Sequence, residues 1–227
     1  MALYIDCAYL AEIEELAAIY PLAGVTTNPS ILLAAAGRGQ RLGDLEVLRA
    51  LLGVCAGPIF MQPTAETHEG LRAAAARYVE VDPARVVLKL AANADGLRLA
   101  RELAPQGVRF AFTACYALPQ AYCGALAGAE WIIPYFGRLR RTGADACQRM
   151  QQMTALLARQ ECTTRILAAS LKSPADVIEV TLAGVQDVTA PPDVIRALAE
   201  EPLTDAAMSQ FAADWEQYQR EIGAQQA

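Results

Sequence analysis

The stretch Val86-Val-Leu-Lys-Leu90 places a lysine within a short apolar run of the kind that forms a buried β-strand. Of the 19 basic residues in the chain, 17 are arginine, and the two lysines are Lys89 and Lys172. Burial disfavours an ammonium ion and lowers the pKa of a lysine, and the resulting neutral amine can attack a carbonyl group to form a Schiff base. The structural alternative is a lysine at a strand end whose stem packs while its ammonium group reaches water.

Short apolar runs like this one alternate with helical patterns along nearly the whole chain, which is typical of βα units and a parallel sheet. We predict eight strands, at residues 3–6, 24–27, 58–62, 86–90, 108–113, 131–136, 165–170 and 187–191. The accompanying helices are predicted at residues 8–18, 29–36, 42–52, 65–79, 95–103, 118–127, 144–158, 174–183 and 192–200. Eight such units in 227 residues predict an α/β fold, a single (β/α)₈ TIM barrel domain.

Residues 203–222 form a further C-terminal segment with apolar side chains at steps of three and four. These side chains are Leu203, Ala207, Phe211, Trp215, Tyr218 and Ile222. The spacing predicts an extra C-terminal helix with one apolar stripe, and such a stripe needs to be covered. The helix could cap its own barrel or pack on a neighbouring subunit; we expect the second, in a homo-oligomer.

The composition argues against nucleic-acid and membrane partners. The formal net charge is −6 and the isoelectric point is near 4.9, so no basic face is expected for a phosphate backbone. The start of the chain lacks the basic and apolar regions of a signal peptide, and no run of about 18 uncharged apolar residues occurs. We therefore expect a cytoplasmic protein.

The six cysteines and the single histidine indicate neither a disulfide framework nor a metal centre. The cysteines form no CxxC pair and stand in apolar or helical surroundings, which favours small core residues. His68 is the one histidine, whereas a catalytic zinc ion normally takes several His or Cys ligands at short spacing. We expect a reaction without a metal.

Catalytic residues of a (β/α)₈ barrel lie at the carboxyl ends of its strands. The polar residues at the ends of the first seven predicted strands are Asp6, Thr26 with Asn28, Gln62, Lys89, Thr113, Tyr135 with Arg138, and Ser170 with Lys172. The eighth predicted strand offers no polar candidate. The set holds an amine, a carboxylate, a phenol, amides, hydroxyls and two cations, although loop starts are polar in many proteins.

These residue types suit one mechanism. Attack of the Lys89 amine on a ketone, followed by loss of water, makes an iminium ion that accepts the electrons of an adjacent carbon–carbon bond as it breaks. Asp6 is the candidate to take the proton of the hydroxyl on the breaking side. Tyr135 could relay protons through a water held by Gln62 and Thr113.

Two cations late in the barrel suggest a phosphate site. Arg138 and Lys172 lie where phosphate sites often occur in this fold, and arginine grips a phosphate with two hydrogen bonds. Each candidate also has a structural reading. Asp6 could cap a helix, Tyr135 could fill the core, and Arg138 could belong to a solvated loop.

The segment 21–30, PLAGVTTNPS, looks like the signature of the transaldolase family. From Leu3-Tyr-Ile-Asp6 to Phe211-Ala-Ala-Asp-Trp215, the chain resembles the short branch of that family, the fructose-6-phosphate aldolases. Further segments match in order: Val87-Leu-Lys89, Ala127-Gly-Ala-Glu130, Pro134-Tyr135, Ala168-Ala-Ser170 with Lys172-Ser-Pro174, and Pro192-Asp-Val194.

The resemblance implies a (β/α)₈ barrel, class I aldol chemistry without metal or cofactor, a sugar phosphate or hydroxyketone substrate, and a homo-oligomer, either a pentamer or a decamer of two stacked pentamers. It also implies roles for individual residues. Lys89 takes the Schiff-base role and Asp6 the acid–base role. The other matches are Gln62, Thr113 and Tyr135 in the water-holding group, Thr26 and Asn28 at substrate hydroxyls, and Arg138, Ser170 and Lys172 at the phosphate end.

Some positions depart from the family pattern. The family usually reads Lys-x-Pro-x-Thr after the nucleophile, whereas this chain has Lys89-Leu-Ala-Ala-Asn93. Arg140-Arg141 stands where an acidic residue often follows Arg138, and Gln62-Pro63 and Pro191-Pro192 also differ from the short branch. We expect a class I, fructose-6-phosphate aldolase-like enzyme with a dihydroxyacetone-type donor. The alternatives are a transaldolase and a sugar-phosphate-binding barrel without catalysis.

Overall fold

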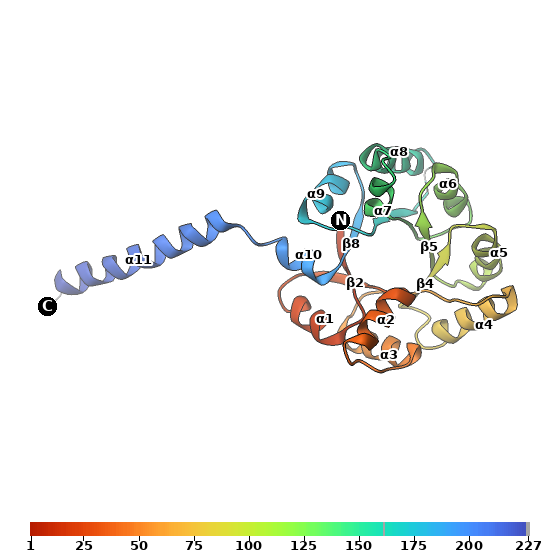
Figure 1. Cartoon of the computed structure of the whole chain (residues 1–227), viewed down its shortest axis with the longest axis horizontal. Coiled ribbons are helices and arrows are strands. Elements are labelled where there is room, and N and C mark those ends of the chain that lie inside the picture. Colours follow the sequence, from red (N-terminus) through yellow and green to blue (C-terminus); the bar gives the residue numbers. More distant parts are fainter. Residues whose placement is uncertain (161, 226–227) are drawn as a thin grey trace.

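The computed structural model describes residues 1–160 and 162–225, and it contains eight parallel strands closed into one barrel in chain order (Figure 1). The strands are β1 (Ala2–Asp6), β2 (Leu22–Thr26), β3 (Ile59–Met61), β4 (Val86–Ala91), β5 (Phe110–Cys115), β6 (Trp131–Pro134), β7 (Arg165–Ala168) and β8 (Asp187–Ala190). Pairing of β1 with β8 closes the barrel. The predicted (β/α)₈ TIM barrel is confirmed.

Helices ring the barrel on its outside (Figure 1). They are α1 (Leu10–Ala17), α2 (Pro29–Gly37), α3 (Asp44–Val54), α4 (His68–Val79), α5 (Ala94–Leu103), the 3₁₀ turn η1 (Ala104–Gln106), α6 (Leu118–Leu126), α7 (Phe136–Arg141), α8 (Ala146–Arg159), α9 (Pro174–Leu182) and α10 (Pro192–Ala197). Capping explains where several begin. The Asn28 side chain accepts a hydrogen bond from the Ile31 amide at 3.0 Å at the start of α2. Ser173 caps α9 in the same way.

Alternation along β4 explains why Lys89 faces the barrel interior. Val87 belongs to the core cluster inside the barrel, and Leu88 belongs to the larger cluster between strands and helices. Successive side chains of a strand point to opposite faces, so Lys89 follows Val87 into the interior. Below it, the rings of Tyr4, Phe60 and Trp131 pack edge to face with centroids 5.1–6.4 Å apart, which fills the barrel beneath the lysine.

The predicted strand at residues 131–136 is wrong at its carboxyl end. β6 ends at Pro134, Tyr135 makes a single bridge to Ala169, and helix α7 begins at Phe136. The amide of Gly137 donates to the Ser170 carbonyl, and a Cβ at Gly137 would lie 2.2 Å from that oxygen. Only glycine allows this close approach of the two backbones. A six-residue helix containing glycine is too short for its periodicity to show in the sequence.

The C-terminal helix α11 (Pro202–Gln225) projects away from the barrel (Figure 1). Its apolar side chains, including Phe211 at 61% and Trp215 at 59%, are exposed, and the Trp215 and Tyr218 rings stack on each other at 5.6 Å. The predicted helix is present, but it does not cap its own barrel. Within the described residues, no helix combines the length and the apolar character needed to cross a bilayer.

Candidate active site

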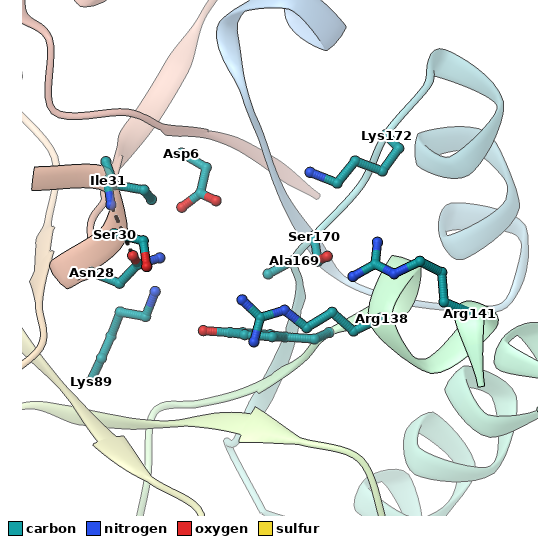
Figure 2. A pocket seen from close by; sticks show the side chains of 11 residues that line it. Asp6, Asn28, Ser30, Ile31, Lys89, Arg138, Arg141, Ala169, Ser170 and Lys172 are labelled. Atoms are coloured by element: carbon teal, nitrogen blue, oxygen red, sulfur yellow. Dashed lines mark hydrogen bonds between the residues drawn. The ribbon is translucent and has the colours of Figure 1, made fainter. Parts of the chain in front are cut away.

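A cavity of about 270 Å³ opens among the carboxyl ends of the strands (Figure 2). Its lining consists of Asp6, Asn28, Ser30, Ile31, Lys89, Tyr135, Arg138, Arg141, Ala169, Ser170 and Lys172. Seven of the ten residues predicted from the sequence therefore lie together. Residues far apart in the chain meet here because all carboxyl ends of a parallel barrel lie on one face.

Lys89 is the buried amine of this cavity. It is 1% exposed, so the strand-end reading with an ammonium group in water is wrong. Burial lowers the pKa of the Lys89 amine, and the negative charge of Asp6 partly opposes this effect. The amine therefore loses its proton more readily than an exposed lysine does, as a nucleophile requires.

Asp6 is held by a chain of two hydroxyl groups. The Thr26 hydroxyl donates to Asp6 Oδ1 at 2.5 Å and lies 2.7 Å from the Thr189 hydroxyl. A hydroxyl has one proton to give, and Thr26 gives its proton to Asp6, so Thr189 must be the donor to Thr26. The Thr26 hydroxyl thus occupies Oδ1 of Asp6, and Oδ2 is left able to take a proton from a substrate hydroxyl.

Thr189 was missed in the sequence, where the eighth strand showed no polar candidate. It is fully buried on β8, 163 residues from its partner Thr26. The available signal was its position two residues after Asp187, because residues at i and i+2 share one face of a strand. Two polar residues on the inner face of an otherwise apolar strand need partners inside the barrel.

Thr113 and Tyr135 form the second polar group. The Thr113 hydroxyl donates to the Tyr135 phenol oxygen at 3.1 Å, which leaves the phenol proton available to another acceptor. Thr113 is followed by a register shift and by Ala114 at φ +55°, a left-handed conformation that is uncommon outside glycine. Tyr135 is 9% exposed, and the Tyr116 ring packs against it edge to face at 6.0 Å.

Basic side chains dominate the other end of the cavity. The Arg138 guanidinium lies over the Tyr135 ring, 4.8 Å from its centroid, and the Lys172 ammonium group points into the cavity (Figure 2). Ser170 between them has φ +63°, a second left-handed residue at this site. Arg141 also lines the cavity, although the sequence marked it only as a departure from the family pattern.

Gln62 is the predicted residue that lies apart. It lines a different cavity of about 180 Å³, formed by β4 and the loops that follow β3 and β4, together with Asn93 and Asp95. Thr26 and Thr113 are not on the cavity wall, but each is hydrogen bonded to a residue that is. The structure thus brings nine of the predicted residues into one constellation and places Gln62 on a separate cavity.

A family model described as transaldolase/fructose-6-phosphate aldolase matches residues 3–226. A protein named "Probable transaldolase" from Phenylobacterium zucineum (strain HLK1) is 36% identical over 215 residues, which cover 95% of this chain and 96% of that protein.

Solved structures share the barrel at low sequence identity. A putative deoxyribose-phosphate aldolase from Coccidioides immitis superposes with a TM-score of 0.52 at 15% identity, covering 82% of this chain and 76% of that one. A mandelate oxidase bound to (S)-2-phenylpropionate gives a TM-score of 0.59 at 13% identity, covering 88% of this chain and 66%, just under two thirds, of that one. At these identities the structures show the fold alone.

Proposed function

The chain belongs to the transaldolase/fructose-6-phosphate aldolase family, and from this premise we propose that it is a class I aldolase acting on sugar phosphates through a Schiff base on Lys89. That it is an aldolase or transaldolase follows from the family. The mechanism and the donor are the proposal. The observation that carries it is the buried Lys89 amine, with a lowered pKa, in a cavity that also holds a carboxylate, a phenol and several cations.

The proposed cleavage runs through Lys89 and Asp6. The neutral Lys89 amine adds to the ketone carbon of the substrate, and loss of water from the carbinolamine gives an iminium ion. Asp6 takes the proton of the hydroxyl two carbons from the iminium carbon. The bond between that hydroxyl-bearing carbon and the carbon next to the iminium carbon breaks, the hydroxyl-bearing carbon leaves as an aldehyde, and the bonding electron pair forms the enamine on Lys89. Protonation of the enamine carbon and hydrolysis then free the three-carbon ketone.

Tyr135 favours a lyase over a transferase. A lyase must protonate and hydrolyse the enamine, whereas a transferase keeps it until an acceptor aldehyde arrives. The phenol proton of Tyr135 is available because the Thr113 hydroxyl occupies the phenol oxygen as a donor. Transaldolase is the second candidate, and the name of the relative that is 36% identical favours it. A barrel that binds sugar phosphates without catalysis has no use for a buried nucleophilic amine.

A donor and acceptor panel tests the proposal. Purified protein with fructose 6-phosphate alone is expected to release glyceraldehyde 3-phosphate and dihydroxyacetone, and to do so equally in EDTA, because the mechanism uses Lys89 as the electron sink. Coupled assays for each product give the rates. Product that appears only after erythrose 4-phosphate is added would establish the transaldolase instead, and loss of activity in EDTA restored by zinc would refute a metal-independent mechanism.

We further propose that the protein works in the cytoplasm as a homo-oligomer in which α11 packs on a neighbouring subunit. The exposed stripe of α11 supports this, because burial of each large apolar side chain is worth roughly 1.5–3 kcal/mol.

Removal of residues 202–227 is expected to break the assembly into smaller species. Light scattering of the full chain should report a closed oligomer, a pentamer or a decamer, at micromolar concentration. The double substitution Phe211→Ser and Trp215→Ser should shift the mass downward, while Gln210→Ser on the same helix should not. A full chain that remains a stable monomer contradicts the proposal.

A further inference from the structure

Three cations surround one end of the cavity, one more than the sequence predicted. Arg138 and Arg141 come from α7, and Lys172 comes from the loop before α9. Figure 2 shows Lys172 and Arg141 beside Ser170, and the Arg138 guanidinium extending from that end toward Lys89.

Helix geometry divides the arginines of α7 between two environments. Arg138 and Arg141 are three residues apart, and residues at i and i+3 lie on the same face of a helix. Arg140 lies on another face and is paired with Asp176 at 2.8 Å and with Glu179 on α9. The charge of Arg140 is thus neutralised by protein carboxylates.

The charges of Arg138, Arg141 and Lys172 are not neutralised by protein carboxylates in this way. Among the described residues, no ion pair joins Arg138, Arg141 or Lys172 to a carboxylate within 4.0 Å. Among the described residues that line the cavity, Asp6 is the one carboxylate, and its charge acts on Lys89. These three cations are exposed to solvent and have no carboxylate partner in the part of the chain that the structure describes, so they are free to bind a ligand anion that enters the cavity.

We propose that Arg141 is a specificity-determining residue that binds the terminal phosphate of the substrate together with Arg138 and Lys172. A phosphate monoester carries a charge of about −1.5 to −2 near pH 7 and three strong acceptor oxygens, so a third cation has an oxygen and a charge to bind. Arg141 makes the cavity prefer phosphorylated sugars over uncharged hydroxyketones of the same length. The inference rests on the proposed function for the identity of the substrate, but its binding step does not require the Schiff base.

The test compares Arg141→Gln with the wild-type protein, using D-glucitol 6-phosphate as the probe. This probe has the phosphate but no carbonyl group, so it cannot react with Lys89. In calorimetry we expect its Kd to rise by roughly tenfold in Arg141→Gln, the loss of one charge-assisted hydrogen bond. Arg141→Lys should recover part of the affinity. Arg101→Gln, which removes an exposed arginine of α5 far from the cavity, should bind as the wild type does.

Kinetics supply the second readout. The KM for fructose 6-phosphate should rise in Arg141→Gln by a similar factor, while the synthetic reaction between dihydroxyacetone and glyceraldehyde, neither of which carries a phosphate, should keep its rate. Equal Kd values for D-glucitol 6-phosphate in the two proteins, or an equal loss of both activities, would overturn the inference.

The two proposals fail in different ways. Weaker binding of D-glucitol 6-phosphate in Arg141→Gln, without any adduct on Lys89, supports the role of Arg141 and refutes the Schiff-base mechanism. An adduct on Lys89 in a wild-type protein that binds no D-glucitol 6-phosphate supports the mechanism and refutes the role of Arg141.

Discussion

Replacement of Lys89 by methionine is expected to lower the turnover of fructose 6-phosphate by at least about 10⁴-fold, near 5.4 kcal/mol of activation free energy. Methionine matches the length and apolar character of the lysine stem but has no amine to form the carbinolamine. The effect exceeds that of any other substitution at the site, because the iminium ion is the electron sink for every later step. Steady-state rates from the coupled assays measure it.

Covalent trapping provides the direct evidence. Borohydride added with dihydroxyacetone should reduce the Schiff base to a stable secondary amine, which peptide mass mapping would locate on Lys89. Lys172→Met is the matched control, because it removes the other lysine of the chain and of the same cavity. It should retain the adduct with this unphosphorylated donor. An adduct on Lys172, or none during turnover, would rule out the Schiff-base role of Lys89.

Lys89→Met is expected to be more stable than the wild type. A stable Lys89→Met protein would show that its loss of activity does not come from unfolding. The pKa of Lys89 is lowered in the folded protein, whereas in the unfolded chain it has its ordinary value of about 10.4. Between the folded pKa and about 10.4, the lysine is protonated in the unfolded chain to a greater extent than in the folded protein. The free energy of unfolding of the wild type therefore falls as the pH falls from about 10.4 toward the folded pKa.

Methionine at position 89 has no amine, so the variant avoids the loss of stability that burial of the Lys89 amine causes. At neutral pH we expect a gain of about 1–4 kcal/mol, the range found when buried ionic groups are replaced by apolar ones. The gain should diminish as pH rises toward 10.4. Urea unfolding at pH 7 and pH 10 would measure it, and a less stable variant would show that the amine is stabilised by contacts other than those described.

Replacement of Tyr135 by phenylalanine is expected to slow the release of the three-carbon ketone by about 10²-fold, the lower end of what general acid–base catalysis contributes. The change removes the phenol proton and leaves the ring that supports Arg138. Transfer of the enamine to erythrose 4-phosphate should be spared, because it does not require hydrolysis. The ratio of free ketone to transfer product measures the change.

Tyr116→Phe is the control for Tyr135. The Tyr116 ring packs against Tyr135, but Tyr116 does not line the cavity. This variant should keep the wild-type ratio of release to transfer. If Tyr135→Phe releases the ketone at the wild-type rate, the phenol does not decide the fate of the enamine. If the wild type itself releases nothing without an acceptor, the protein is a transaldolase.

Much of the site could be predicted because parallel topology does the positioning. Once alternating apolar runs and helical patterns indicate eight βα units, any polar residue at a strand end is directed to one face of the barrel. The neighbours Val87 and Leu88 alone placed Lys89 in a buried strand, since a strand of apolar residues on both faces lies inside the protein, but they left open whether its ammonium group reaches water. No distant contact had to be known for either inference.

The sequence by itself therefore determined the barrel, the position of Lys89 on an apolar strand and most of its polar neighbours, because these depend on local periodicity and on the ends of strands. Only the tertiary structure placed Thr189 beside Thr26, since closure of β8 onto β1 brings together hydroxyls 163 residues apart. It also showed that Arg141 lines the cavity whereas Arg140 pairs with carboxylates of α9. This difference depends on the short helix α7 and on its packing beside α9. Contacts of this kind arise between elements distant in the chain, and no local pattern of residues encodes them.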